Sequence, residues 1–293
     1  MKIWVTGAAG MLGSEVVVAL QDANLTVAAS DREVDITDAG AISCYLDQKG
    51  HPDWIVNCAA WTAVDQAETH EAAAFALNAE GPALLADAAK RCDARMIHLS
   101  TDYVFNGKAK EPYLPDSPVA PCSVYGKSKL AGEVAVREGL AAHVIIRTAW
   151  LYGRNGPNFV ATMLRLMRER DEIGVVADQH GAPTYAADLA SGICRVVLAP
   201  SALAGTWHYT NRGQTTWFAF AQAIQEMGIE AGLLDHKCRM QALTTAQYPT
   251  PAARPMYSVL DTTSFEKNWE VTIPHWRDSL KAYMQEVRGK REA

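Results

Sequence analysis

The sequence lacks the features that mark membrane-spanning and nucleic-acid-binding proteins. None of its apolar stretches approaches the roughly 18 consecutive apolar residues of a membrane span. It has no lysine–arginine cluster, and 27 basic residues against 33 acidic ones give a net charge of −6. Because anionic lipids and phosphate backbones are bound through clustered positive charge, we expect neither a membrane nor a nucleic acid as partner.

Cysteine is scarce and scattered. The six cysteines include no Cys-x-x-Cys pair and no Cys/His cluster with zinc spacing. The apolar stretch after Lys2 is interrupted by glycines at 7, 10 and 13, and no signal-peptide cleavage region follows it. We therefore expect buried free thiols and a reducing, cytoplasmic location.

Short β-branched segments alternate with amphipathic ones in the first half of the chain. The strand-like segments are 2–6, 25–30, 53–60, 94–100 and 143–148. Apolar residues recur at helical spacing in 11–21 and 72–92. Because the strand segments are nearly all apolar, helices should cover both faces of their sheet. The pattern predicts an α/β protein with a Rossmann-type, doubly wound parallel sheet.

The regular alternation of strand-like and helical segments ends at about residue 150. Helical segments at 158–171 and 186–199 flank a short strand-like one at 172–177, and segment 245–258 carries three of the chain's 13 prolines. Proline lacks the amide donor that a helix interior or central strand needs, so this last segment should be a loop or a crossover. We predict one domain in 1–150 and a smaller lobe made mainly of 151–293.

Some later segments are expected to return to the first domain, near 170–180 and 205–230. In particular, WHYTN at 207–211 should add a strand to the sheet, with the helix of TTWFAFAQAI (215–224) packed behind it.

Three glycines follow the first strand at three-residue spacing: Gly7, Gly10 and Gly13. Glycine permits a tight turn there and lets a pyrophosphate approach the amides of a helix N-terminus, where Met11 and Leu12 stand. A glycine turn without a ligand is the alternative, but the strand–loop–helix context favours a dinucleotide site.

Asp31 follows Gly13 by 18 residues, at the end of the second strand-like segment. An acidic residue there typically holds the ribose hydroxyls of NAD, whereas the guanidinium of Arg32 would suit the 2′-phosphate of NADP. The pair leaves the choice of NADH or NADPH open, with a slight preference for NADPH.

Two Tyr-x-x-x-Lys pairs occur, Tyr45/Lys49 and Tyr125/Lys129, where about 0.4 are expected by chance. This spacing puts both side chains on one helical face, where the ammonium can lower the tyrosine pKa. Tyr45 belongs to a crossover helix that runs away from the ligand-binding edge of the sheet, and we interpret it as a half-buried helix residue. Tyr125 follows the fourth strand at the correct edge.

Thr101 stands at the end of that fourth strand. Its hydroxyl could hydrogen-bond a substrate carbonyl while tyrosine protonates it, or could act as a local cap. The glycine loop and Tyr125 nearby favour the catalytic interpretation.

The motifs TGAAGMLG (6–13), STDYVF (100–105) and YGKSK (125–129) together resemble the extended short-chain dehydrogenase/reductase superfamily. Within it, segments covering nearly the whole chain are similar to the dTDP-4-dehydrorhamnose reductases. These segments are 57–68, 77–89, 147–153, 158–166, 178–186, 215–221 and 248–258.

The resemblance implies nucleotide-sugar biosynthesis. In this family NAD(P)H reduces the C4 ketone of dTDP-4-dehydro-β-L-rhamnose, a dTDP-linked 4-keto-6-deoxyhexose, to dTDP-β-L-rhamnose. By analogy, Tyr125 gives its proton to the carbonyl oxygen and Thr101 orients that carbonyl. Lys129 then binds the nicotinamide ribose and stabilises the tyrosinate.

The resemblance also assigns contacts around the ligands. The segment Cys58, Ala59, Ala60 and Trp61 would pass beside the cofactor, and Asp35 with Ile36 would meet its adenine end, although Asp35 reads equally well as a loop cap.

On the substrate side, the resemblance implies contacts from Asp102 and Trp150, with a core aromatic as the alternative for Trp150. Arg254 suits the nucleotide diphosphate because guanidinium pairs with phosphate oxygens, with a surface salt bridge as the alternative.

Some family members bind magnesium at a dimer interface, and here the match is incomplete. Glu15 fits the first ligand position, but the second stretch, 185–188, has Asp188 as its single carboxylate. Hard divalent cations need several oxygen ligands, so we expect no metal, and the choice between monomer and homodimer stays open.

Two other functions stay compatible with the sequence. One is a regulatory, NADP-binding subunit of the methionine adenosyltransferase type, which shares these motifs. The other is a reductase of a different nucleotide-linked 4-keto sugar.

Overall fold

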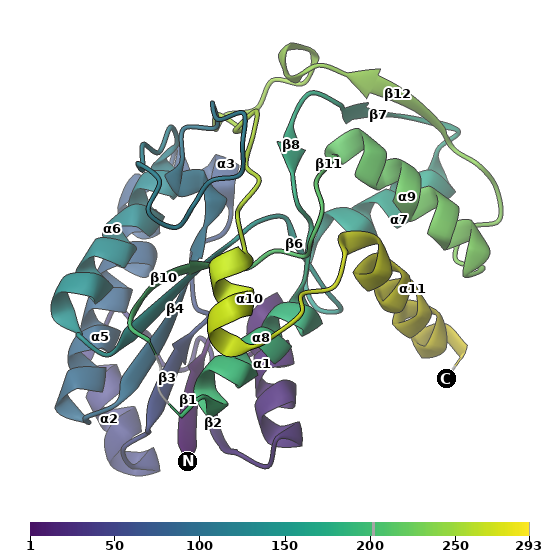
Figure 1. Cartoon of the computed structure of the whole chain (residues 1–293). Coiled ribbons are helices and arrows are strands. Elements are labelled where there is room, and N and C mark those ends of the chain that lie inside the picture. The colour runs from purple at the N-terminus through teal and green to yellow at the C-terminus, as the bar shows by residue number, and fades with distance from the viewer. Residues whose placement is uncertain (201–202, 293) are drawn as a thin grey trace.

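The computed structural model describes residues 1–200 and 203–292. In that part of the chain, parallel strands form a six-stranded sheet in the order β10-β5-β4-β3-β1-β2 (Figure 1). The strands are β1 Lys2–Thr6, β2 Thr26–Ser30, β3 Trp54–Asn57, β4 Arg95–Thr101, β5 His143–Thr148 and β10 Gly205–His208. The chain moves from β1 to β2 on one side and then to β3 on the other, which confirms the predicted doubly wound sheet.

Helices cover both faces of this sheet (Figure 1). One face carries α1 (Met11–Asp22), α8 (Ala186–Leu198) and α10 (Thr263–Trp269), and the other carries α2 (Ala39–Lys49), α5 (Gly81–Arg91) and α6 (Val124–Gly139). Successive strand residues point to opposite faces, so Val5 belongs to the first core cluster and Trp4 to the second. This two-sided burial explains why the strands are apolar throughout.

A second group of elements has its own core, at the upper right of Figure 1. Its helices α7, α9 and α11 pack around Tyr152, Met167, Phe220 and Leu280, beside the parallel pair β7–β12. The bounds are α7 Phe159–Glu169, α9 Trp217–Glu230, α11 Trp276–Glu292, β7 Glu172–Val176 and β12 Arg239–Leu243.

The remaining elements in the described residues are short. They are α3 Val64–Ala67, α4 Glu71–Phe75, the π-helix η1 Ala76–Glu80, the 3₁₀ helices η2 Asp102–Val104 and η3 Thr245–Gln247, and the strand pairs β6 Leu151–Tyr152 with β9 Thr184–Tyr185 and β8 His180–Gly181 with β11 Thr215–Thr216. The helix predicted over 72–92 is therefore α4, η1 and α5 in succession. Apart from η3, segment 245–258 is irregular, as its prolines predict.

The returning segments differ in part from the prediction. β10 adds a strand to the sheet, as expected for 207–211, and lies beside β5 at the sheet edge. The prediction for 170–180 was wrong, because β7 pairs with β12 outside the six-stranded sheet. The prediction for α9 was also wrong: its apolar face packs on α7 and α11 and not behind β10. Instead α8, which is apolar on most of its surface, returns to pack against α1.

The six cysteines are free, as predicted, but Cys44 and Cys122 are exposed, so the expected burial was wrong for these two. In the described ranges no helix is both long and apolar enough to span a membrane.

Candidate active site

The glycine loop lies where the carboxyl ends of β1 and β3 meet. Gly7 has a positive φ of +64°, and a Cβ added to it would lie 2.6 Å from the Ala59 nitrogen. A Cβ on Gly13 would lie 2.1 Å from the Gly7 carbonyl oxygen. Glycine is therefore required for this close approach, which leaves the first-turn amides of α1 at the ligand edge of the sheet. Leu12 itself is 7% exposed and packs in the core, so its backbone is the part available to a ligand.

The residues predicted for the adenosine half follow β2. Arg32 is exposed and Asp31 half-buried, beside the glycine loop whose Ala8 amide donates to the Ser30 carbonyl at 2.9 Å. The Asp35 carboxylate accepts hydrogen bonds from the amide and the hydroxyl of Thr37, which lower its pKa. Asp35 thus has the geometry of a loop cap.

Ile36 is 3% exposed and lies against α5. A Cβ added to Gly81, at the start of α5, would come within 2.7 Å of the Ile36 side chain. Ile36 therefore contributes mainly to the core.

The loop after β3, Cys58–Trp61, is held by asparagines. Asn57 Oδ1 accepts from the Thr6 hydroxyl at 2.8 Å and from the Ala59 amide at 3.1 Å. Asn78, from the π-helical turn η1, bonds both the amide and the carbonyl of Trp61 and also the Ser128 hydroxyl on α6. Sequence reasoning missed Asn78; its signal is a polar, poor helix former within an apolar helical segment.

Tyr125 and Thr101 are brought together by the start of α6. The Ser123 side chain caps this helix by accepting from the Gly126 amide at 3.1 Å. A Cβ on Gly126 would lie 2.2 Å from the Tyr103 carbonyl oxygen, so the first turn packs directly on η2. Tyr125 consequently hydrogen-bonds Thr101, and its ring meets that of Tyr103 edge to face at 5.4 Å.

Lys129 lies one turn further along α6, but its charge does not outweigh the effect of burial on the pKa of Tyr125. Burial raises that pKa, with the Asp102 carboxylate adding to the rise and the Thr101 hydrogen bond opposing it. Lys129 Nζ donates to the Leu99 carbonyl at 2.6 Å, and burial lowers the pKa of Lys129 to about 8. The expected lowering of the Tyr125 pKa was therefore wrong for this structure: desolvation dominates, and the ammonium is held by β4.

Asp102 lies next to the same hydroxyl. It is 2% exposed, and its Oδ1 accepts from the Thr101 hydroxyl at 2.9 Å. Burial raises the pKa of Asp102 to about 6, although the hydroxyls of Ser258 and Thr101 oppose the rise. The carboxylate is thus part of the buried Thr101–Tyr125 cluster and not a surface group.

Tyr45, from the other Tyr-x-x-x-Lys pair, has a structural role, as predicted. Tyr45 is 8% exposed, stacks on Trp4 at 4.8 Å and donates its hydroxyl to the Ala29 carbonyl.

Trp150 and Arg254 come from segments beyond β5. Trp150 has a φ of +48°, unusual for a bulky residue, and its half-buried ring stacks on Trp217 at 3.6 Å. Arg254 is held by Asp65 at 2.6 Å and donates to the Tyr103 hydroxyl at 3.3 Å. Arg254 is therefore connected to Tyr125 through the ring of Tyr103.

The residues of the incomplete magnesium site are engaged with protein groups. Both oxygens of Glu15 accept hydrogen bonds from Arg154, and Asp188 accepts from Asn211 and Ser279. No cluster of three or more His, Cys, Asp or Glu suited to a metal occurs in residues 1–200 and 203–292. This donor set does not fit magnesium.

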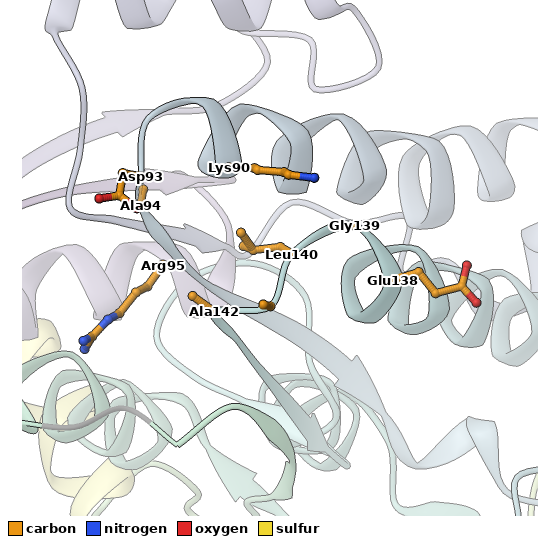
Figure 2. A pocket seen from close by; sticks show the side chains of 9 residues that line it. Lys90, Asp93, Ala94, Arg95, Glu138, Gly139, Leu140 and Ala142 are labelled. Atoms are coloured by element: carbon orange, nitrogen blue, oxygen red, sulfur yellow. The ribbon is translucent and has the colours of Figure 1, made fainter.

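A surface pocket of about 590 Å³ lies elsewhere, lined by the ends of α5 and α6 and the start of β4 (Figure 2). Its residues Lys90, Arg95 and Glu138 are at the amino edge of the parallel strands, opposite Thr101. Ligands of doubly wound sheets bind at the carboxyl edge, so this pocket is not the candidate site.

Comparison with known proteins agrees with this geometry. A family model described as the RmlD substrate binding domain matches residues 1–289. A dTDP-4-dehydrorhamnose reductase of Streptomyces griseus is 45% identical over 292 residues, which cover 98% of this chain and 94% of that protein. The chain belongs to the dTDP-4-dehydrorhamnose reductase family.

Two further relatives bear on ligands of this family. The crystal structure of a dTDP-4-dehydrorhamnose reductase from Bacillus anthracis, described as a complex with NADP, is 37% identical with a TM-score of 0.91, covering 97% of this chain and 99% of its own. A Streptomyces antibioticus protein described as "Probable dTDP-4,6-dihydroxy-2-methyloxan-3-one 4-ketoreductase" is 42% identical over 290 residues, 98% of this chain and 96% of that protein.

Proposed function

We propose that this chain uses NADPH to reduce the C4 ketone of dTDP-4-dehydro-β-L-rhamnose to dTDP-β-L-rhamnose. The observation that carries the proposal is the placement of Thr101, Tyr125 and Lys129 at the sheet edge that also holds the glycine loop. The names of the relatives with 37–45% identity support the reaction and the cofactor.

The glycine loop fits a dinucleotide, because added Cβ atoms at Gly7 and Gly13 would collide with neighbouring backbone. Gly7, Gly10 and Gly13 with the amides of Met11 and Leu12 would hold the pyrophosphate. Asp31, Arg32, Asp35 and Ile36 would meet the adenosine half, and Cys58–Trp61 would line the nicotinamide side. The bound nicotinamide supplies the hydride that C4 receives.

The chain's own residues supply the proton that the carbonyl oxygen receives. Because burial raises the pKa of Tyr125, its phenol is protonated at neutral pH and can donate to the carbonyl oxygen. Thr101 would orient that oxygen, and Lys129 would hydrogen-bond the nicotinamide ribose while its charge stabilises the tyrosinate. The complete set supports catalysis over a purely regulatory NADP-binding role.

The sugar nucleotide would bind between the sheet edge and the lobe formed mainly by 151–293. Asp102 would contact the sugar, the ring of Trp150 would pack on it, and Arg254 would pair with the diphosphate. The Streptomyces antibioticus relative makes another dTDP-linked 4-keto sugar the second candidate substrate. The free cysteines support a cytoplasmic location, and nothing in the acidic surface charge suggests a nucleic acid or membrane partner.

The test follows NADPH oxidation by the purified protein on dTDP-4-dehydro-L-rhamnose, with the variants Tyr125→Phe and Tyr45→Phe compared with the wild type. Loss of general acid catalysis should lower kcat of Tyr125→Phe by roughly 10²–10⁴-fold. Tyr45→Phe, the matched control, should turn over within a few-fold of the wild type. A folded wild type that binds NADPH but does not turn over this sugar would refute the proposal. Another dTDP-linked 4-keto sugar would then be the favoured substrate.

A further inference from the structure

A buried ionic cluster lies behind Tyr125 and Lys129. Glu133 follows Lys129 by one helical turn, so the three side chains share one face of α6. The Glu133 carboxylate has no exposed surface, and it accepts from Arg147 Nε at 2.8 Å, from Arg147 Nη2 at 2.6 Å and from the Ser100 hydroxyl at 2.6 Å. The mechanism above assigns no role to this carboxylate.

Arg147 is locked in place from β5. Its side chain is 3% exposed, Nη1 donates to the Pro115 carbonyl at 3.0 Å, and the guanidinium packs over the ring of Phe105. Arg137, partly exposed, approaches the same carboxylate at 3.6 Å. A carboxylate bound by this many donors is held in one position, so its charge acts on neighbouring groups from a fixed place.

Lys129 precedes Glu133 by one turn on the same face of α6. Burial lowers the pKa of Lys129, and Glu133 opposes that effect. The other titratable groups that face Lys129 are Cys58 from the loop after β3, whose pKa burial raises to about 12, and His98 from β4, whose pKa burial lowers. Both are neutral at pH 7, so Glu133 supplies the negative charge that acts on Lys129 there.

We propose that Glu133 is a positioning residue: fixed by Arg147 and Ser100, its charge keeps the buried Lys129 protonated while the tyrosinate forms, and so sets the upper pH limit of turnover. The inference rests on the proposed reductase function for its kinetic readout. An ion pair that only fastened α6 to β5 would affect stability and leave this pH limit where it is.

The test records kcat against pH for the wild type, Glu133→Gln and Glu133→Gln/Arg147→Met. Glu133→Gln removes the attractive charge and leaves the guanidinium unpaired, so the alkaline limb should move down by about one pH unit. Removing Arg147 as well should move the limb part of the way back, still below the wild type, because Arg147 lies beyond Glu133. Glu138→Gln, an exposed glutamate on the same helix, is the control and should not move it.

A second readout needs no sugar: the pH dependence of NADPH binding, followed by nicotinamide fluorescence, should shift in the same order. A shift in binding without any turnover would support the effect of Glu133 on Lys129 and refute the proposed function. A folded Glu133→Gln variant whose limb and binding profile match the wild type overturns the inference. If that single variant does not fold, the double variant, which leaves no unpaired guanidinium in the core, decides in the same way.

Discussion

Polar side chains at the carboxyl edge of the sheet differ mainly in their exposure to solvent. Thr101, Asp102 and Lys129 are each at most 5% exposed, whereas Arg32 is exposed. Burial raises the pKa of Asp102 and lowers the pKa of Lys129, and both shifts favour the neutral form of the group. Charged groups at this site therefore lower the stability of the folded protein, and substitutions that remove a charge can measure that effect.

Asp102→Asn should stabilise the protein at neutral pH. The folded pKa of about 6 lies above the ordinary value of 3.8, so the wild type loses stability as pH rises from about 4 to about 6, while asparagine does not titrate. The free energy of unfolding of Asp102→Asn, relative to that of the wild type, should be about 2 kcal/mol higher at pH 7 than at pH 4. Urea denaturation at both pH values measures this. A difference that is equal at both pH values would contradict this, and Asp116→Asn, at an exposed aspartate, is the control variant.

Arg32→Ala tests the choice of cofactor. If the exposed guanidinium binds a 2′-phosphate, its loss should raise the KM for NADPH roughly tenfold and leave the KM for NADH nearly unchanged, because NADH lacks that phosphate. Steady-state kinetics with both cofactors measures this. Equal changes for both would remove Arg32 from the phosphate site, and Arg91→Ala, on exposed α5 surface, controls for general charge effects.

Elements that the sequence predicts well are those whose signals are local. The strands of the main sheet and α1 follow from apolar runs and glycines, and the structure places each within a few residues of the prediction. The π-helical turn η1 was not predicted, because its extra residue is stabilised by Asn78 bonding to Trp61 and Ser128, 17 and 50 residues away.

Gly132→Ala should disturb the packing of α6 on η1. An added Cβ would lie 2.0 Å from the Asn78 carbonyl oxygen, so α6 must move away from the turn that holds Trp61. We expect a loss of about 1–3 kcal/mol in thermal or urea denaturation, as for other overpacked sites. Gly139→Ala, on the same helix, meets its nearest neighbour at 3.5 Å and should be neutral or slightly stabilising; equal stability of both variants would contradict the prediction.

At the scale of the whole molecule, contacts distant in sequence close the site. Asp65 binds Arg254 across 189 residues and also accepts from the Ala252 amide at 3.1 Å. This joins the proline-rich segment to α3, and Arg254 also donates to the Tyr103 hydroxyl, whose ring meets that of Tyr125. The proline pattern predicts an irregular segment here, but not the partner it meets.

Arg254→Ala should raise the substrate KM about tenfold or more with little change in the KM for NADPH, because a charge-assisted hydrogen bond to phosphate is worth roughly 1.5–3 kcal/mol. Asp65→Asn separates this role from a structural one, since it breaks the ion pair but keeps the guanidinium. The substrate KM of Asp65→Asn should change less than that of Arg254→Ala. An unchanged KM in Arg254→Ala would show that its ion pair is structural.

The sequence by itself determined the doubly wound sheet, the glycine loop and the position of Tyr125 relative to Thr101. These depend on residue periodicity, on steric freedom at glycine and on the rule that parallel strands end at one edge, all of which are readable locally. The tertiary structure alone decided the direction of the Tyr125 pKa shift, the departure of β7 and α9 from the main sheet and the Glu133–Arg147 cluster behind Lys129. The reason is physical: burial and charge pairing are set by side chains that come together from distant segments, and no local pattern records which segments those are.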